Sequence, residues 1–209
     1  MVVGACAPGA WAQASAKAAA TPPRPPLILV LGDSLSAEYG LARGTGWVAL
    51  LEKQLAQDKL AATVVNASVS GETTAGGRSR LAALLAQHKP SHVVIELGGN
   101  DALRGLPLKN TEENLTWMTQ AAQKAGARVL LVGMQVPPNY GADYANRFAG
   151  LFATVAQAQK AAVVPFFLKG VADGADPTRL FQPDRIHPRA EAHPQMLANV
   201  WPELRKLLR

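Results

Sequence analysis

The segment LILVLGDSLS, Leu27–Ser36, is the stretch of this sequence that decides the fold. It begins with a continuous apolar run, Leu27–Leu31, and ends in glycine and polar residues. A run without polar alternation is typical of a strand that is covered on both faces of a parallel sheet. The segment therefore predicts a buried strand followed at once by a polar turn, which is where such sheets bind ligands.

Four further β-branched or leucine-rich runs follow, separated by segments with the spacing of amphipathic helices. The runs are Ala62–Asn66, His92–Leu97, Arg128–Gly133 and Ala162–Phe167. The helical segments span Trp47 to Leu55, Leu81 to Leu85, Leu115 to Ala122 and Phe148 to Val155, and a last helix is predicted over Ala190–Leu208. Strands that alternate with helix-length crossovers indicate an α/β fold, so we expect one three-layer α/β/α domain with a five-stranded parallel sheet over residues 27–209.

The composition excludes several classes of protein. Hydrophobic residues make up 48% of the 209 residues and charged residues 17%, which is enough apolar material for a core and too much for a disordered chain. No apolar run reaches the roughly 18 residues of a membrane-spanning helix, so we expect no integral membrane span. The formal net charge is +6, but it is not gathered into a long basic run, and we expect no nucleic-acid partner.

Residues 1–26 differ from the rest, because they are rich in alanine and proline, lack acidic residues and hold the only cysteine, Cys6. Small-x-small triplets such as Ala12-Gln13-Ala14 resemble signal-peptidase sites, and Thr21–Pro26 resembles a stiff linker. We interpret residues 1–26 as a signal-peptide remnant, whose true start lies upstream, followed by an Ala/Pro-rich linker. This predicts a periplasmic or secreted protein. Two alternatives are a lipoprotein anchored through Cys6, since Val3–Cys6 loosely resembles a lipobox, and a disordered leader without function.

Polar segments follow the first three predicted strands and would converge at one edge of the sheet. They are Gly32–Ser36, Ser70–Thr74 and Gly98–Asp101. Ser34 would lie at a strand-to-helix turn with an exposed hydroxyl, although a serine there also commonly caps a helix. Gly71 offers an unobstructed backbone N–H and Asn100 a side-chain amide, which are suitable donors for an oxyanion.

A fourth polar segment, Asp184–Pro188, lies near the end of the chain. The three-residue spacing allows the Asp184 carboxylate to hold one imidazole nitrogen of His187 and leave the other free, as in the orienting acid and base of a catalytic triad. One alternative is an ordinary surface pair. Another is a metal site that includes Glu191 and His193, but its spacing matches no standard zinc signature and we expect no metal.

The four segments together, GDSLS, NASVSGET (Asn66–Thr73), GGND and DRIHP, resemble the blocks of the SGNH, or GDSL, hydrolase superfamily. Two longer segments, LGGNDALRGL (Leu97–Leu106) and VPPNYG (Val136–Gly141), are similar to those of the bacterial multifunctional acyl-CoA thioesterase I / lysophospholipase / arylesterase subgroup. The resemblance covers nearly all of residues 27–208. It implies a flavodoxin-like sheet and a serine hydrolase that cleaves acyl esters and thioesters through an acyl-enzyme.

The resemblance also implies a role for individual residues. Ser34 would be the nucleophile, His187 the base and Asp184 the acid that orients it, and the oxyanion hole would comprise Ser34, Gly71 and Asn100. Asp33 and Asp101 are interpreted as residues that hold loops. The residues expected to line an acyl-binding groove are Leu103, Leu106, Leu108, Val136 and Pro137.

Small-molecule acyl esters and thioesters are therefore the expected substrates, without a metal or organic cofactor, and contact with a lipid surface is compatible with them. Two other functions are compatible with parts of the sequence. A carbohydrate O-acetylesterase could use the same blocks, but the leucine-rich segment after Asn100 argues against it. A non-catalytic, surface-tethered module is favoured only by Cys6 and disfavoured by the intact set of Ser34, Asp184 and His187.

Overall fold

The structure is a computed structural model that describes residues 1–4 and 25–209 of the chain. The strands are β1 (Leu27–Gly32), β2 (Thr63–Asn66), β3 (His92–Glu96), β4 (Arg128–Val132) and β5 (Ala162–Val164). The α-helices are α1 (Trp47–Gln57), α2 (Thr74–His88), α3 (Gly99–Leu103), α4 (Leu108–Lys124), α5 (Ala142–Gln159) and α6 (His193–Leu207). Two short 3₁₀ helices, η1 (Pro138–Tyr140) and η2 (Ala190–Ala192), complete the described elements.

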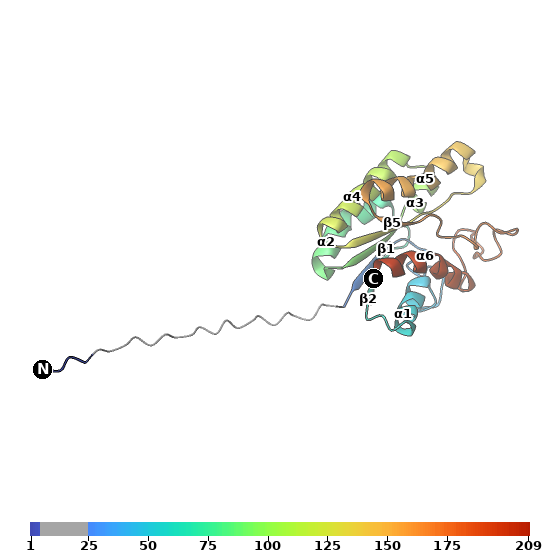
Figure 1. Cartoon of the computed structure of the whole chain (residues 1–209). Coiled ribbons are helices and arrows are strands. Elements are labelled where there is room, and N and C mark those ends of the chain that lie inside the picture. Colours follow the sequence, from blue (N-terminus) through green and yellow to red (C-terminus); the bar gives the residue numbers. More distant parts are fainter. Residues whose placement is uncertain (5–24) are drawn as a thin grey trace.

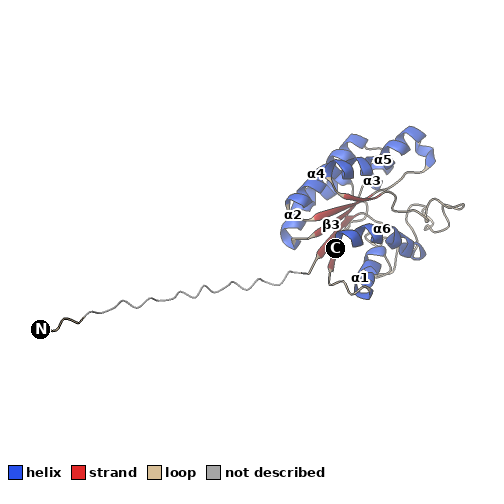
Figure 2. Ribbon diagram, viewed as in Figure 1, coloured by secondary structure: helices blue, strands red, loops and turns tan. Residues whose placement is uncertain are grey.

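The strands form one parallel sheet of five in the order β2-β1-β3-β4-β5. Helices α1 and α6 cover one face, and α2, α4 and α5 cover the other (Figures 1 and 2). The prediction of a three-layer α/β/α domain with a five-stranded parallel sheet is confirmed. The carboxyl ends of β1 and β3 lie side by side in this order, with β2 next to β1.

The core lies on both faces of the inner strands β1, β3 and β4. Every residue of β3 is buried, and β1 is buried from Ile28 to Gly32. Aromatic side chains complete the packing. Trp47 lies edge-on to Phe167, and Phe148 lies edge-on to Phe152 on α5. This rigid centre fixes the positions of the loops that leave β1 and β3, and these loops carry the polar segments.

The edge strands differ from the prediction of burial on both faces. In β2, Thr63 and Asn66 are exposed and the two valines between them are half-buried, because β2 pairs with β1 alone. Strand β5 stops at Val164, short of the predicted Phe167. Pro165 follows it and has no N–H with which to continue the ladder.

The turn after β1 also differs from expectation, because no α-helix begins at Ser34. The chain makes a helical turn, in which the N–H of Ala37 donates to the Asp33 carbonyl (2.9 Å), and then leaves it at Glu38, whose φ is 59°. The first helix begins at Trp47. After β3, by contrast, a short helix, α3, begins directly at Gly99, and Gly98 precedes it with a φ of 122°.

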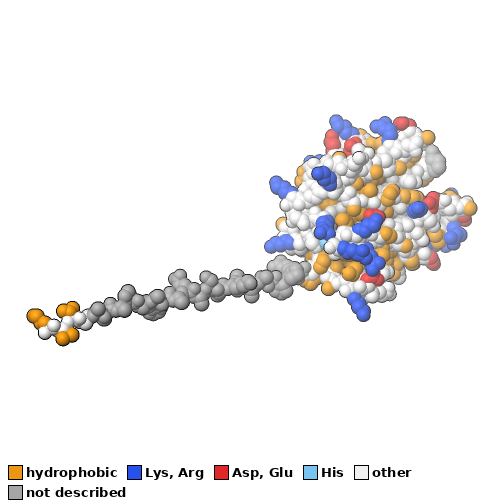
Figure 3. Space-filling view, viewed as in Figure 1, with side chains coloured by type: hydrophobic (Ala, Val, Ile, Leu, Met, Phe, Trp, Pro, Cys, Tyr) orange, Lys and Arg blue, Asp and Glu red, His pale blue; other side chains and the backbone are white. Residues whose placement is uncertain are grey.

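The predictions for residues 5–24, including the signal-peptidase sites and Cys6, lie outside the described residues. No helix of the described part is long and apolar enough to cross a membrane. On the face drawn in Figure 3, acidic side chains are interspersed among the basic ones, which is consistent with the diffuse charge inferred from the sequence.

Candidate active site

A cleft of about 360 Å³ lies at the carboxyl edge of the sheet, where the predicted polar segments meet. Its walls come from the turn after β1, the loop after β2, the start of α3 and the Asp184–Pro188 segment. The lining residues are Asp33, Ser34, Leu35, Tyr39, Ser70, Gly71, Gly99, Asn100, Leu103, Ile186 and His187. Residues as far apart in sequence as Ser34 and His187 therefore share one cavity.

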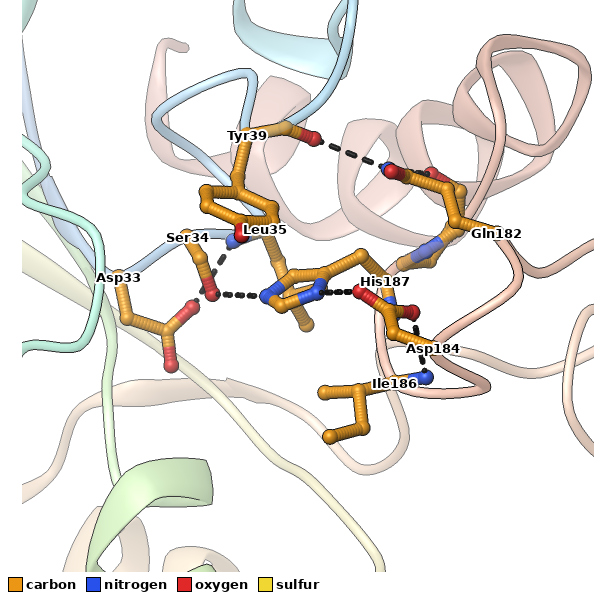
Figure 4. Close-up of polar contacts among 9 residues, drawn as sticks. Asp33, Ser34, Leu35, Tyr39, Gln182, Asp184, Ile186 and His187 are labelled. Atoms are coloured by element: carbon orange, nitrogen blue, oxygen red, sulfur yellow. Dashed lines mark hydrogen bonds and ion pairs between the residues drawn. The ribbon is translucent and has the colours of Figure 1, made fainter.

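Ser34, His187 and Asp184 form a continuous hydrogen-bonded chain (Figure 4). The His187 Nε2 lies 2.9 Å from the Ser34 Oγ, and the His187 Nδ1 lies 2.6 Å from the Asp184 Oδ2. An ionised carboxylate can only accept, so the Nδ1 carries the hydrogen and the Nε2 is left to accept the serine proton. This is the arrangement that activates a serine for attack on a carbonyl.

Asp184 is kept ionised by its hydrogen bonds. Burial acts to raise its pKa, but the bond from the His187 ring and those from the N–H groups of Ile186 and His187 outweigh it and lower the pKa of Asp184 to about 2. Both carboxylate oxygens are used, since the Oδ1 accepts from the two backbone groups and the Oδ2 from the imidazole. The carboxylate can therefore orient His187 at any pH near neutrality.

Residues that the sequence did not indicate support this segment. The ring of Tyr39 lies 4.3 Å from that of His187, centroid to centroid. The Gln182 side-chain amide donates to the Tyr39 carbonyl (3.0 Å) and to the Pro188 carbonyl (3.1 Å), which ties the segment to the turn after β1 (Figure 4). Tyr39 and Gln182 stand outside the four blocks and only the tertiary structure brings them to the site. Arg185 adopts a φ of 58°, in the left-handed region that is uncommon for non-glycine residues.

Two of the predicted oxyanion donors are backbone N–H groups at the cleft that have no protein acceptor among the described residues. They belong to Ser34 and Gly71. Gly71 has a φ of 78°, where a side chain would be strained, and its carbonyl accepts a 2.8 Å hydrogen bond from the Arg104 Nη2. This bond fixes the peptide on the carbonyl side of Gly71 and so restrains the loop that presents its N–H.

Asn100, the third predicted donor, also lines the cleft but is held by two protein acceptors. Its Nδ2 donates to the Asp33 Oδ2 (3.0 Å) and to the Glu72 carbonyl (3.0 Å). An amide nitrogen has two hydrogens, so both are engaged here and a substrate oxygen would have to share one of them. Asn100 is thus oriented before substrate arrives.

Asp33 and Asp101 hold loops, as predicted. The Asp33 Oδ1 accepts from the Leu35 N–H (3.0 Å), and the Asp101 Oδ2 accepts from the Thr74 N–H (2.8 Å), which joins α3 to the first turn of α2. Asp33 is almost fully buried, and burial raises its pKa to about 6. Neither carboxylate takes part in the Ser34–His187–Asp184 chain.

His193, one of the candidate metal ligands, has a structural role. Within residues 1–4 and 25–209, no group of three or more His, Cys, Asp or Glu side chains is arranged to hold a metal ion. His193 is buried at the start of α6, where its Nδ1 accepts from the Trp47 N–H (3.0 Å). His92, at the start of β3, is also buried, and its Nε2 lies 2.9 Å from the Leu207 carbonyl. Both histidines join elements of the fold.

Of the five residues predicted to line an acyl groove, Leu103 is a lining residue of the cleft, and the other four, Leu106, Leu108, Val136 and Pro137, are not. Leu108 and Val136 pack partly against the core. Three exposed apolar side chains that line the cleft, together with Val69 next to the lining residue Ser70, form what we call the apolar rim. It comprises Tyr39, Val69, Leu103 and Ile186. Between residues 25 and 209, these four are the large hydrophobic residues that are exposed.

A second hollow, of about 490 Å³, lies outside the site on α4 and α2 and shares no residue with the cleft. Its lining residues are Arg78, Lys109, Glu112, Glu113, Thr116, Trp117 and Gln120. The Arg78 guanidinium lies over the Trp117 ring, 5.0 Å from its centroid. Its lining contains no serine, cysteine or histidine.

Comparison with known proteins supports the same chemistry. Residues 30–194 match the model of the GDSL-like Lipase/Acylhydrolase family. The chain is 52% identical to Esterase TesA of Pseudomonas aeruginosa over 181 residues, which cover 87% of this chain and 89% of that protein. It is 41% identical to thioesterase 1/protease 1/lysophospholipase L1 of Escherichia coli K12 over 167 residues, which cover 80% and 77%.

Solved structures agree with the observed fold. The psychrotrophic esterase EstA from Pseudoalteromonas, in a structure inhibited by monoethylphosphonate, superposes with a TM-score of 0.80 at 40% identity, covering 87% of this chain and 98% of that one. An acetylxylan esterase from Geobacillus stearothermophilus, in a catalytic-mutant structure, reaches a TM-score of 0.74 at 21% identity, covering 86% and 94%. At that identity the second comparison shows a common fold alone.

Proposed function

Because this chain belongs to the GDSL-like lipase/acylhydrolase family, and is thus an SGNH-type carboxylic ester hydrolase, we propose that it hydrolyses acyl esters and thioesters with Ser34 as nucleophile. The observation that carries this assignment is the chain of hydrogen bonds from the Ser34 Oγ through the His187 ring to the Asp184 carboxylate. These three residues come from opposite ends of the sequence. Their meeting in one cleft, beside two N–H groups without a described acceptor, supports acyl transfer.

The reaction proceeds in two steps. The His187 Nε2 accepts the Ser34 proton as the Oγ attacks the substrate carbonyl, and the resulting oxyanion takes hydrogen bonds from the N–H groups of Ser34 and Gly71 and from the Asn100 amide. The imidazolium then gives the proton to the departing alcohol or thiol. A water molecule, deprotonated by the same imidazole, attacks the acyl-enzyme, and the acid leaves as Ser34 regains its proton.

The apolar rim supports an acyl substrate over an acetylated sugar. Leu103 and Ile186 line the cleft and are each 47% exposed, so they offer an aliphatic surface next to Ser34. A fatty acyl chain would cover this surface and gain about 0.8 kcal/mol for each buried methylene, whereas an acetyl group is too short to do so. The esterase, thioesterase and lysophospholipase names of the relatives point to the same class of substrate.

The same rim supports transient contact with lipid surfaces. Its four side chains come from separate segments and are about half exposed, and three of them, Tyr39, Leu103 and Ile186, line the cleft that a lysophospholipid would enter. We also propose that residues 1–26 are a signal-peptide remnant and linker and that residues 27–209 form the hydrolase domain. Export to the periplasm follows from that composition, and the mass of the protein recovered from a periplasmic extract tests it.

Substitution of Ser34 by alanine tests the proposed function. Turnover of p-nitrophenyl esters should fall on the order of 10⁴-fold or more, and labelling by a fluorophosphonate probe should disappear. Ser79→Ala is the matched control, because the Ser79 hydroxyl on exposed α2 only donates to the Gly76 carbonyl. Retained labelling of the Ser34 variant, with an unchanged melting temperature, would show that another residue is the nucleophile.

A further inference from the structure

A second carboxyl group lies beneath the site and takes no part in the mechanism above. Glu96, the last residue of β3, is 2% exposed. Its Oε2 accepts a 2.7 Å hydrogen bond from the Ser36 Oγ, which in turn accepts from the Trp47 Nε1 (3.0 Å). The same Oε2 lies 3.4 Å from the backbone nitrogen of Asp33, whose own carboxyl group is 3% exposed and acts electrostatically on that of Glu96. Two acidic side chains thus meet in the interior, directly below the turn that carries Ser34.

This pair has no basic partner in the part of the chain that the structure describes. None of the salt bridges found there involves Asp33 or Glu96, and the one cationic influence on Asp33 is the charge of His187 when protonated. Burial raises the pKa of Glu96 well above its usual value, and the neighbouring Asp33 raises it further. Two buried carboxylates in contact cannot both be ionised without a large electrostatic penalty.

We propose that Glu96 and Asp33 share one proton, held on Glu96, and that the resulting Asp33 carboxylate is a positioning residue for the oxyanion donor Asn100. Glu96 then donates to Asp33 and still accepts from Ser36. Asp33, as an anion, accepts from the Leu35 N–H through one oxygen and from the Asn100 Nδ2 through the other. A protonated or amide side chain at position 33 could not accept equally well on both sides.

The arrangement has a consequence for catalysis. The Asn100 amide needs two acceptors to fix its plane, and the Glu72 carbonyl supplies one while Asp33 supplies the other. Without the second acceptor the amide can rotate, and its nitrogen no longer has a fixed position at the cleft. Orientation of such donors before the reaction is what makes them effective, because none of the binding energy is then used to align them.

The proton can be observed without any turnover, so this test is independent of the proposed function. The infrared difference spectrum between the wild-type protein and Glu96→Gln at pH 7 should show the carbonyl stretch of a protonated carboxylic acid, lost in the variant. Absence of that band in the wild-type protein would overturn the shared proton. A band that survives in Glu96→Gln but disappears in Asp33→Asn would overturn its assignment to Glu96.

Glutamine also resembles a protonated glutamate in shape, since it donates through its amide and accepts through its oxygen. Glu96→Gln should therefore retain the activity that Glu96→Leu loses. If the two variants were equally impaired at equal melting temperature, the carboxyl group would act in some other way. Wild-type protein alone still decides the question by infrared spectroscopy if neither variant folds.

A double-mutant cycle tests the positioning role, and here the inference rests on the proposed function. Asp33→Asn should lower kcat for a p-nitrophenyl ester by roughly 100-fold with little change in KM, which is the lower end of the cost of losing an oxyanion donor. In an Asn100→Ala background the same substitution should cost little more, because Asp33 acts through Asn100. Fully additive losses would overturn the positioning role while leaving Ser34 as nucleophile.

Discussion

Gly32 pairs with Glu96 in the ladder between β1 and β3, and the missing side chain of the glycine leaves room for the buried carboxyl group. A Cβ atom on Gly32 would come within 2.9 Å of the Glu96 Oε2 and 2.7 Å of the Ser36 Oγ. The glycine that opens the GDSLS segment is therefore required because a larger residue would collide with the Ser36 and Glu96 side chains. Its role is distinct from supplying a turn.

Substitution Gly32→Ala should lower the free energy of unfolding by about 1–3 kcal/mol, because overpacking at a buried site forces neighbours apart. It should also reduce kcat, since Ser36 follows Ser34 in the same turn. Denaturation by urea and ester turnover measure the two effects. Gly150→Ala, on the exposed face of α5, is the matched control. A Cβ there meets nothing within 4 Å, and alanine should stabilise the helix slightly.

Arg104→Ala should reduce kcat with little effect on KM. The variant frees the Gly71 carbonyl, so the loop that presents the Gly71 N–H loses a restraint while the N–H itself remains. We expect a fall of roughly 10-fold, less than the roughly 100-fold or more caused by removing a donor outright. Arg147→Ala is the control for loss of an arginine, because Arg147 lies on the exposed face of α5. An unchanged kcat in Arg104→Ala would show that the loop is held without it.

The apolar rim should determine preference for acyl-chain length. In Leu103→Ser and Ile186→Ser, kcat/KM for long-chain p-nitrophenyl esters should fall by about 10-fold relative to the acetyl ester, which corresponds to one or two methylenes losing contact. The acetyl ester is the internal reference for the integrity of the catalytic residues. Trp117→Gln, in the second hollow, should leave the preference unchanged. A shift in that variant instead would place the acyl chain on α4.

His193 should make the protein sensitive to acid. Burial lowers its pKa below the ordinary value of 6.5, although hydrogen bonding to Pro188 and the charge of Glu38 act to raise it. Below about pH 6.5 the unfolded chain binds a proton at this position that the folded chain does not, so the free energy of unfolding falls with pH. The contribution of His193 to the free energy of unfolding should therefore fall between pH 7.5 and pH 5, whereas the raised pKa values of Asp33 and Glu96 act in the opposite direction.

The variant His193→Asn isolates this contribution, because asparagine can still accept from the Trp47 N–H and does not titrate in this range. Other groups, such as Asp33 and His92, titrate equally in both proteins. The difference in stability between wild type and variant should thus shrink as the pH falls. A constant difference across the range would mean that His193 is protonated alike in the folded and unfolded states.

The amino-acid sequence by itself determined the layered α/β fold and the identity of the candidate catalytic residues. Continuous apolar runs such as Leu27–Leu31 indicate buried parallel strands, and the carboxyl ends of those strands must share an edge. The meeting of Ser34 with Asn100 at one edge follows from that rule alone. The pairing of Asp184 with His187 is equally local, because their spacing places both on one turn.

Contacts between distant segments were decided by the tertiary structure. No pattern in the sequence indicates that Glu96, within an apolar strand, would meet Asp33, or that Tyr39 and Gln182 would support His187. Exposure at the edge strand β2 and burial of His92 and His193 likewise depend on which elements come to lie beside them. Hydrophobic periodicity reports only whether a position faces a core, whereas hydrogen-bond partners and the charge of buried groups depend on side chains that packing brings together from the whole chain.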